Sequence, residues 1–312
     1  MTGINGRRMI SRVSAIIPVR NRPHFLREAV ESLIATGFPN LEILIVDDGS
    51  EDDTLERARE LERRFPAVVR ALQHADEGNH GPGASRNLGV LAAAGEYVCF
   101  LDSDDVVLPD RFRRAVPLLA ADATIDAVCE PFLIEDGDGP LSPAPVREPG
   151  RFRLGSGGRW HTNTVLMRRE SFLDLGGFSE RLRTCEDLVL WGKLKLASRI
   201  DTRGSEPVAV YRRHSTNERL VLENSLWAYL EVMHWAKSRT LEATERTALQ
   251  DAVWGKALFV SDRLRRSGRP ALALRMLLAA LRSHPAFASR PGLWKNLFRD
   301  AVDMGIGTWK HR

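Results

Sequence analysis

The sequence predicts an α/β protein in which a mainly parallel sheet is flanked by helices and followed by a helical C-terminal region. Short apolar segments rich in β-branched residues alternate with segments of helical periodicity over the first hundred residues. Two of the apolar segments run straight into aspartates, Asp48 and Asp102. Beyond about Leu220 the spacing of apolar residues is helical throughout. These features together predict a ligand-binding edge at the carboxyl ends of the strands.

The elements follow one another in a regular order. The segment 13–19 is apolar and rich in Val and Ile, which predicts a buried strand, and 23–36 then has apolar residues at helical spacing. Ser50, with Asp53 three residues later, predicts the N-cap of the next helix. The same criteria give strands at 41–46, 68–72 and 96–101, and helices at 54–65 and 84–94.

The later part of the chain is less regular. The stretch 137–158 is rich in Gly and Pro, which predicts a long irregular loop that closes over the site. A short apolar segment follows at 164–167, and 187–197 has the pattern of a helix. We find no internal repeat.

Composition limits the classes of protein that fit. The chain has 312 residues, of which 43% are hydrophobic and 28% charged, so it can bury a full core. A net charge of +4 suits anionic ligands, but no local pattern supports nucleic-acid binding. Three cysteines without a CxxC pair indicate neither a disulfide framework nor a zinc site, and they fit a reducing cytoplasm.

The strongest candidate site is the acidic run 102–105, Asp-Ser-Asp-Asp, at the end of a predicted strand. Carboxylates this close repel one another, and a bound divalent cation would relieve the repulsion. Oxygen ligands suit Mg²⁺ or Mn²⁺. The alternative is a capped turn, because aspartate is common where strands end.

Three further segments carry candidate residues, each with a structural alternative. Asp48 ends a strand where a base or ribose could bind, although turn chemistry also explains it. Arg86 and Asn87 lie in the first turns of a helix that follows two glycines, an arrangement that suits anion or base contact, although a simple loop-to-helix junction explains this segment equally well. Glu186 and Asp187 begin a predicted helix, where acidic side chains either favour the dipole or supply a general base.

Taken together, five segments resemble glycosyltransferase family 2, whose members have the GT-A fold. They are 16–22 (IIPVRNR), 46–50 (VDDGS), 83–89 (GASRNLG), 100–105 (FLDSDD) and 185–187 (CED). The resemblance covers roughly residues 11–215, and several weak motifs in the right order are more specific than any one of them. It implies a Rossmann-like mixed, mainly parallel sheet, with a catalytic domain at 11–219 and a helical region at 220–312. The nucleotide-binding half would be 11–105 and the acceptor half 106–219.

The resemblance also implies roles for single residues. Asp187 matches the catalytic base, with Glu186 beside it. Asp104 matches the direct metal ligand, and His214 matches a histidine that sometimes joins it. The implied donor contacts come from Pro18, Arg20, Asp48, Arg86, Asn87, Asp102 and Ser103, with Asp102 also at the metal. Pro18-Val19-Arg20 stands where family members often have Pro-Thr-Tyr, so the usual contact of that segment with the base is in doubt.

The implied reaction is transfer of a sugar, with inversion, from a nucleotide-diphosphate sugar to an acceptor hydroxyl. A UDP-sugar is the favoured donor, Mn²⁺ or Mg²⁺ the cofactor, and the acceptor a saccharide, a lipid-linked sugar or another hydroxyl compound. The apolar stripe beside Lys295 and Arg299 either packs on the protein or contacts the inner face of a membrane. The helical region could also form a homodimer.

Two other functions use the same residues. Asp102-Ser-Asp-Asp-Val106 also fits the DxDxV start of a haloacid-dehalogenase-type phosphatase, in which Asp102 would be the nucleophile. That motif normally opens its domain, whereas here a full βαβ region precedes it. A GT-A-like domain could also serve as a non-catalytic scaffold or sugar-binding module, although all the acidic positions are present.

Overall fold

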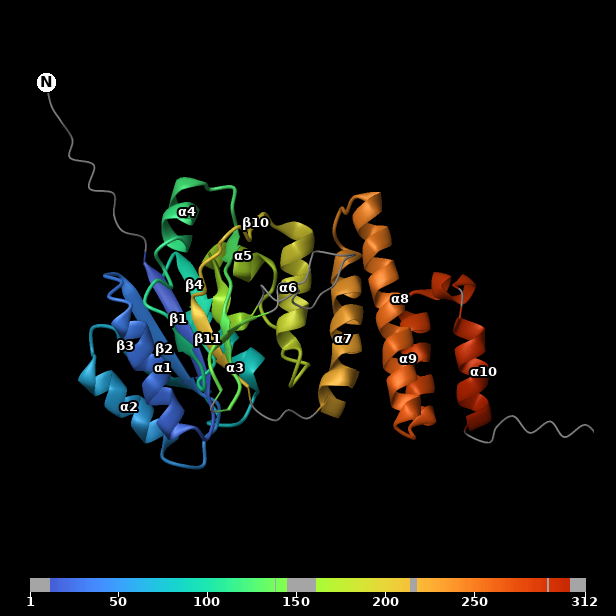
Figure 1. Cartoon of the computed structure of the whole chain (residues 1–312), viewed down its shortest axis with the longest axis horizontal. Helices are drawn as coiled ribbons and strands as arrows, with labels where there is room; N and C mark the ends of the chain where they lie inside the picture. The colour runs from blue at the N-terminus through green and yellow to red at the C-terminus, as the bar shows by residue number, and fades with distance from the viewer. Residues whose placement is uncertain (1–11, 138, 145–160, 214–217, 291, 304–312) are drawn as a thin grey trace, which may run out of the picture. The chain divides into compact units, whose positions relative to one another are not determined.

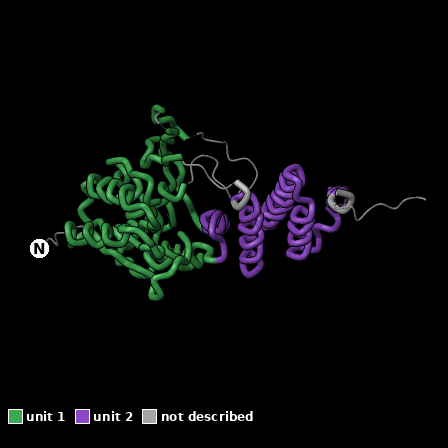
Figure 2. The backbone as a smooth tube through the Cα atoms, turned by 90° about the horizontal axis from the view of Figure 1, so that it is seen from below, with its two compact units in different colours: residues 1–148, 156–180, 197–215 green, residues 149–155, 181–196, 216–312 purple. Residues whose placement is uncertain are grey.

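The computed structural model describes residues 12–137, 139–144, 161–213, 218–290 and 292–303. They form two compact units, shown in different colours in Figure 2. The first unit takes in residues 1–148, 156–180 and 197–215, and the second takes in 149–155, 181–196 and 216–312. Residues 181–196 therefore group with the helical region, on the other side of the boundary that we expected at 219.

A seven-stranded sheet forms the centre of the first unit, in the strand order β10-β6-β9-β4-β1-β2-β3. Strands β1, β2, β3 and β4 are parallel to their neighbours within this group. Every residue of β1 and β2 is buried, as expected for parallel strands covered on both faces. Their bounds are Val13–Val19 for β1, Leu41–Asp47 for β2, Val69–Gln73 for β3 and Tyr97–Phe100 for β4. The mainly parallel sheet that the sequence predicts is confirmed.

One strand of this sheet runs in the opposite direction. β9 (Val165–Arg168) is antiparallel to β4 on one side and to β6 (Ala127–Cys129) on the other. The two-residue strand β10 (Ile200–Asp201) completes the edge next to β6. Because β9 is antiparallel, the residues just before it lie beside the residues just after β4. This brings the 3-10 turn Thr162–Thr164 next to Asp102.

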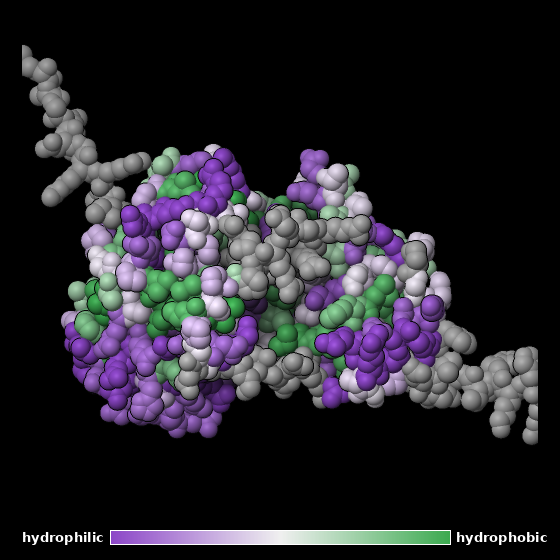
Figure 3. Space-filling model, viewed as in Figure 1, coloured by the Kyte–Doolittle hydropathy of each residue, from purple (hydrophilic) through white to green (hydrophobic). Residues whose placement is uncertain are grey.

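Helices pack around the sheet, as Figure 1 shows. Proline begins both α1 (Pro23–Ala35) and α3 (Pro82–Ala92), where its fixed φ and missing N–H cost nothing. α2 (Thr54–Arg64) buries only Thr54, Ala58 and Leu61, and the surface over it is hydrophilic in Figure 3. The remaining helices of the unit are α4 (Ala115–Ala121) and α5 (Arg169–Asp174).

The N-cap that we expected at Ser50 is wrong. Helix α2 begins at Thr54 with Asp53 as its N-cap residue. Ser50 is instead part of the preceding turn, where its N–H donates to Asp47 Oδ2 at 3.1 Å. Its hydroxyl accepts a hydrogen bond from the N–H of Asn21 at 3.1 Å. Ser50 therefore ties the end of β2 to the end of β1.

A second, four-stranded sheet has the order β5-β11-β7-β8. Its strands are β5 (Val106–Val107), β7 (Leu133–Glu135), β8 (Ser142–Pro143) and β11 (Ala209–Arg212). β11 is antiparallel to β5, so its C-terminal residues lie beside the start of β5 and next to Asp105. Of the loop expected at 137–158, residues 138 and 145–158 lie outside the described part, and β8 occupies two of the others.

The second unit is helical. Its helices are α6 (Glu186–Ala197, of which residue 197 belongs to the first unit), α7 (Glu218–Ala236), α8 (Ala243–Arg266), α9 (Pro270–Ser283), a 3-10 turn (Pro285–Ser289) and α10 (Leu293–Asp303). They share one core that includes Leu226, Val253 and Leu277, and Leu293 of α10 is fully buried in it. Trp294 of the same helix is 65% exposed. Among the described residues, no helix is long and apolar enough to cross a membrane.

Candidate active site

The acidic run 102–105, which we call the acidic turn, follows directly on β4, near the middle of the large sheet. The N–H of Asp105 donates to the carbonyl of Asp102 at 3.0 Å, which closes a four-residue turn. Leu101 before the turn is buried, and its N–H donates to the carbonyl of Ile16 in β1. The turn is therefore held in place by the sheet itself, at the edge where the parallel strands end.

Asp102 is paired with an arginine from α3. Arg86 donates to Asp102 Oδ1 at 2.6 Å, and the guanidinium lies over the ring of Phe178 at 5.1 Å. Burial by itself would raise the pKa of Asp102, but the nearby positive charge of Arg86 outweighs it, and the net shift is downward. Asp102 is therefore held as a carboxylate. The sequence places Arg86 near a ligand but does not reveal this partner.

Asp104 and Ser103 occupy the middle of the turn. Asp104 forms an ion pair with Arg22, which is the N-cap residue of α1 and is 43% exposed. The Asp104 side chain is 13% exposed, less than the 27% of Asp102. Ser103 is buried. The expected metal ligand therefore has a partly exposed cationic partner that another cation could replace.

Asp105 is the most buried carboxylate of the turn, with 1% exposure. Its Oδ1 accepts from the N–H of Arg212 at 2.7 Å, and its Oδ2 accepts from the amide of Asn163 at 2.5 Å. Burial, and after it the neighbouring charge of Asp102, raise the pKa of Asp105 to about 8. Burial and the charge of Asp102 therefore both disfavour the charged form of Asp105.

His161 is a member of the site that the sequence analysis missed. One ring nitrogen of His161 and one carboxylate oxygen each from Asp102 and Asp105 all lie within 4.8 Å of one another. The imidazole ring lies 4.6 Å from the ring of Tyr211 and 5.2 Å from that of Phe132, measured between centroids. Burial lowers the pKa of His161, while the charge of Asp102 acts in the opposite direction. A lone histidine after an irregular stretch carries no sequence signal that would have found it.

These three side chains fit a divalent cation. Two carboxylates and a neutral imidazole are common ligands of Mn²⁺, and carboxylates alone also suit Mg²⁺. Burial is the main cause of the upward shift of the Asp105 pKa, and a cation placed among these atoms would act in the opposite direction by favouring the charged carboxylate. Asp104 lies beside this group but is not one of the three. His214, the other expected ligand, lies outside the described residues.

Asp48 lies one residue beyond the end of β2. Its Oδ1 accepts from the N–H of His80 at 2.7 Å, and its Oδ2 accepts from the N–H of Gly81 at 2.9 Å. Gly81 immediately precedes α3. Helix α3 is therefore fixed at two points, by Asp48 at its first turn and by the Arg86–Asp102 pair further along. A nucleobase could hydrogen-bond to Asp48 only through the carboxylate lone pairs that these two N–H groups do not use.

Three other residues were expected to contact the sugar donor: Pro18, Arg20 and Asn87. Pro18 is buried within β1 and pairs in register with Val46. Arg20 is exposed just after β1, where it forms an ion pair with Glu51 at 3.0 Å. Asn87 accepts from the N–H of Phe178 at 2.9 Å and donates to its carbonyl at 3.0 Å, so its amide holds a loop of the protein.

Glu186 and Asp187 begin α6, in the second unit. Cys185 before them has a φ of +64°, an unusual conformation for a residue with a side chain. Glu186 is buried, and Asp187 accepts a hydrogen bond from the N–H of Leu188 at 2.9 Å. Both acids therefore lie in the first turn of the helix, as the sequence predicts.

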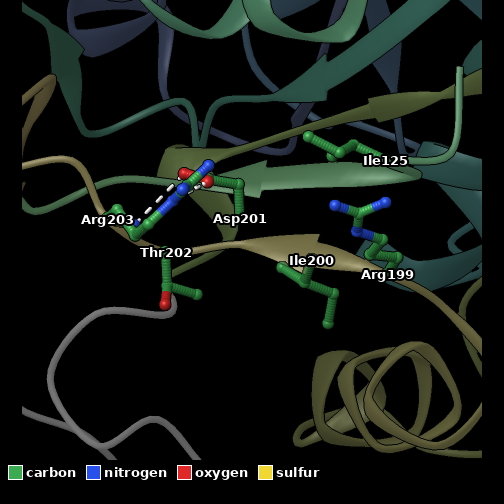
Figure 4. Close-up of a pocket in the computed structure, with 6 residues that line it drawn as sticks. All are labelled: Ile125, Arg199, Ile200, Asp201, Thr202 and Arg203. Atoms are coloured by element: carbon green, nitrogen blue, oxygen red, sulfur yellow. Dashed lines mark hydrogen bonds and ion pairs between the residues drawn. The ribbon is translucent and has the colours of Figure 1, made fainter. Parts of the chain in front are cut away.

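A pocket of about 180 Å³ lies elsewhere, at the edge strand β10 (Figure 4). It is lined by Ile125, Arg199, Ile200, Asp201, Thr202 and Arg203. Asp201 is held there by ion pairs with Arg114 and with Arg203. Two strands, β6 and β9, separate β10 from β4, and the pocket has no part of the acidic turn in its lining.

The fold defines a class, namely GT-A-like proteins, and the acidic turn lies at the carboxyl edge of its sheet. The family model described as glycosyl transferase family 2 matches residues 14–176, more than half of the chain. The chain therefore belongs to glycosyltransferase family 2. This membership does not favour the phosphatase or the scaffold alternative.

Individual relatives agree with this family. An uncharacterised glycosyltransferase of Rickettsia felis is 42% identical over 103 residues, which are 33% of this chain and 16% of the relative. The uncharacterised glycosyltransferase alr2836 of Nostoc sp. is 31% identical over 138 residues, 44% of this chain and 42% of the relative. The chain thus spans less than half the length of either protein.

Solved structures share the fold. TarS 1-349 of S. aureus, in complex with UDP, superposes with a TM-score of 0.71 at 21% identity, covering 94% of this chain and 88% of that one. The mannosyltransferase PcManGT of Pyrobaculum calidifontis, in complex with GDP-Man and Mn²⁺, gives a TM-score of 0.60 at 18% identity, covering 95% and 86%. The expectation of a GT-A fold is confirmed.

Proposed function

We propose that this chain is an inverting glycosyltransferase that moves a sugar from a nucleotide-diphosphate sugar to an acceptor hydroxyl, with the help of a divalent cation. The observation that carries the proposal is the gathering of Asp102, Asp105 and His161 within 4.8 Å at the end of β4. In a member of glycosyltransferase family 2, this is where a donor diphosphate and its cation are expected.

The donor half of the site is built from charges that suit a diphosphate. Arg86 and Arg22 each pair with a carboxylate of the acidic turn, and both cations lie at the edge where the strands end. A diphosphate that arrives with a cation can take over one partner of each pair, so little charge is left uncompensated. Structures of relatives contain UDP, UDP-GlcNAc or GDP-Man, which supports a nucleotide-sugar donor, and we propose a UDP-sugar.

The cation site has two sets of candidate ligands. Asp102, Asp105 and His161 form the group described above, and Asp104 is the ligand that the family pattern implies. For Asp104 to join, it must release Arg22, whose long and partly exposed side chain can move at low cost. When bound, Mn²⁺ or Mg²⁺ would stabilise the negative charge that develops on the leaving diphosphate.

The acceptor half of the reaction is assigned to α6. Asp187 would take the proton of the acceptor hydroxyl as the oxygen attacks the anomeric carbon. The bond from that carbon to the diphosphate breaks on the opposite side, so the configuration inverts. Glu186, which is buried beside it in sequence, would hold Asp187 or the acceptor in position.

A thermal-shift experiment tests the proposal. The protein is melted with UDP, GDP, CDP, ADP or dTDP, each with and without Mn²⁺, and with the matching monophosphates as controls. A ligand at 100 times its Kd stabilises a protein by about 2.7 kcal/mol, which at about 2–4 °C per kcal/mol raises the melting temperature by about 5–11 °C. We expect such a shift for one diphosphate, UDP, and only with Mn²⁺. Equal melting temperatures across the whole panel would contradict the proposal.

A further inference from the structure

The side chain of Asn163 forms hydrogen bonds with two residues of the acidic turn, Asp102 and Asp105. Asn163 is fully buried and belongs to the 3-10 turn that precedes β9. It lies 61 residues from Asp102 and 58 residues from Asp105 along the chain. A buried amide must find partners for its oxygen and its nitrogen, and both partners here belong to the acidic turn.

Asn163 accepts one of these hydrogen bonds and donates the other. The N–H of Asp102 donates to Asn163 Oδ1 at 2.9 Å, and Asn163 Nδ2 donates to Asp105 Oδ2 at 2.5 Å. The orientation of the amide is therefore fixed, since the reverse orientation would set the amide NH₂ group, a donor, against the N–H of Asp102, another donor. Aspartate at this position could accept from Asp102 but could not donate to Asp105 without holding a proton.

Asn163 also contacts the third member of the group. Its backbone N–H donates to Nδ1 of His161 at 3.4 Å, the bond that caps the 3-10 turn. One residue thus touches Asp102, Asp105 and His161. The backbone bond between Asp105 and Asp102 fixes the turn but not the direction of the Asp105 carboxylate, which depends on Asn163 and on the N–H of Arg212.

We propose that Asn163 is a positioning residue that sets the relative geometry of the three side chains of the cation site. The proposal rests on the proposed function, because it assumes that these side chains bind a divalent cation. Ligands must be held in place before binding if affinity is not to be lost to reorganisation, and the groups that orient ligands are often as important as the ligands.

The test measures Mn²⁺ binding directly, from the electron paramagnetic resonance signal of free Mn²⁺ during titration. In Asn163→Leu, which keeps the approximate volume but removes both polar groups, we expect the Kd for Mn²⁺ to rise at least tenfold. The matched control is Val165→Ala, two residues away in β9. Val165 is fully buried and its side chain has no polar group, so the control weakens the same segment without removing a hydrogen bond to the acidic turn. We expect its Kd to stay within twofold of wild type.

A second variant covers the case in which Asn163→Leu does not fold. Asn163→Gln keeps both amide groups but moves them by roughly one carbon–carbon bond, about 1.5 Å. We expect its Kd for Mn²⁺ to rise at least threefold, with a circular dichroism spectrum like that of wild type. A Kd equal to wild type in the folded Asn163 variants would overturn the positioning role. Absence of Mn²⁺ binding by the wild-type protein would instead contradict the cation-dependent function itself.

Discussion

The guanidinium of Arg86 and the carboxylate of Asp102 meet at 2.6 Å, so helix α3 and strand β4 are joined by a charged hydrogen bond. The arginine is 6% exposed and the aspartate 27% exposed. A bond of this kind, largely shielded from water, is stronger than a surface ion pair. The pair is therefore both a structural link and a preformed source of positive charge beside the acidic turn.

Replacing this arginine is expected to destabilise the protein. Arg86→Met keeps the length of the side chain but removes the hydrogen bond to a charged group, which costs about 1.5–3 kcal/mol of unfolding free energy. Urea denaturation at pH 7 measures the change. The control is Arg113→Met, because Arg113 is 77% exposed in its ion pair with Asp110 and should contribute less than about 0.5 kcal/mol. Equal effects of the two substitutions would contradict our account.

Gly49 is expected to tolerate no side chain. It has a φ of +70°, and a Cβ added to it would lie 2.8 Å from the backbone carbon of Gly78. Gly37 has a similar φ of +63°, but a Cβ there meets nothing within 4 Å. Gly37→Ala should therefore cost only the backbone term, about 1–2 kcal/mol, and Gly49→Ala should cost clearly more. Thermal unfolding of the two variants separates the clash from the φ effect, and a smaller loss in Gly49→Ala would refute it.

The pH dependence of stability should depend on Glu42, a residue of β2 that is 2% exposed. Burial would raise its pKa, but hydrogen bonds from Ser14 at 2.5 Å and from the N–H of Ala94 at 2.9 Å, with the charge of Arg12, lower it overall. Its stabilising contribution is therefore complete above the ordinary value of 4.5 and is lost as the pH falls through the lower value in the folded state.

Glu42→Gln tests this expectation. At pH 7 the variant should be less stable by about 1.5–3 kcal/mol, the value of a hydrogen bond to a charged group. The difference from wild type should shrink as the pH falls below 4.5, and urea denaturation at pH 7 and pH 3.5 measures it. Glu51→Gln, which alters the exposed pair with Arg20, should show little difference at either pH. A constant difference for Glu42→Gln would show that the carboxylate charge does not matter.

Most strands of the first hundred residues were predictable as short continuous apolar segments, and the helices were predictable because each is long enough to show the helical period. The acidic turn could be placed for the same reason, since Asp102 follows a buried strand of the predicted sheet. His161 and Asn163 could not, because their approach to Asp102 depends on β9 running antiparallel to β4. The role of Arg212 could not be predicted either. It contacts Asp105 through its backbone N–H, a group that does not depend on the type of side chain.

The family pattern implies that Asp104 binds the metal, whereas the structure groups Asp102, Asp105 and His161 without it. Measurements of Mn²⁺ binding distinguish these two sets of ligands. If Asp104 is a ligand, Asp104→Asn should weaken Mn²⁺ binding at least tenfold, a loss typical of altered metal sites. Asp110→Asn, a nearby exposed carboxylate, is the control and should bind as wild type does. An unchanged Kd in Asp104→Asn would leave Asp102, Asp105 and His161 as the ligands.

The assignment of Asp187 can be separated from its structural role, because an acid in the first turn of a helix also stabilises the helix dipole. Asp187→Asn should keep donor binding within twofold, since the residue is assigned to the acceptor, and should lower sugar transfer by at least about 100-fold, the contribution typical of a general base. Glu245, in the first turn of α8, is the matched control for the dipole. Glu245→Gln should cost about 0.3–1 kcal/mol of stability, as should Asp187→Asn, but should leave transfer unchanged. If both variants kept full transfer, Asp187 would act on the helix alone, and the base would have to be sought among the other carboxylates.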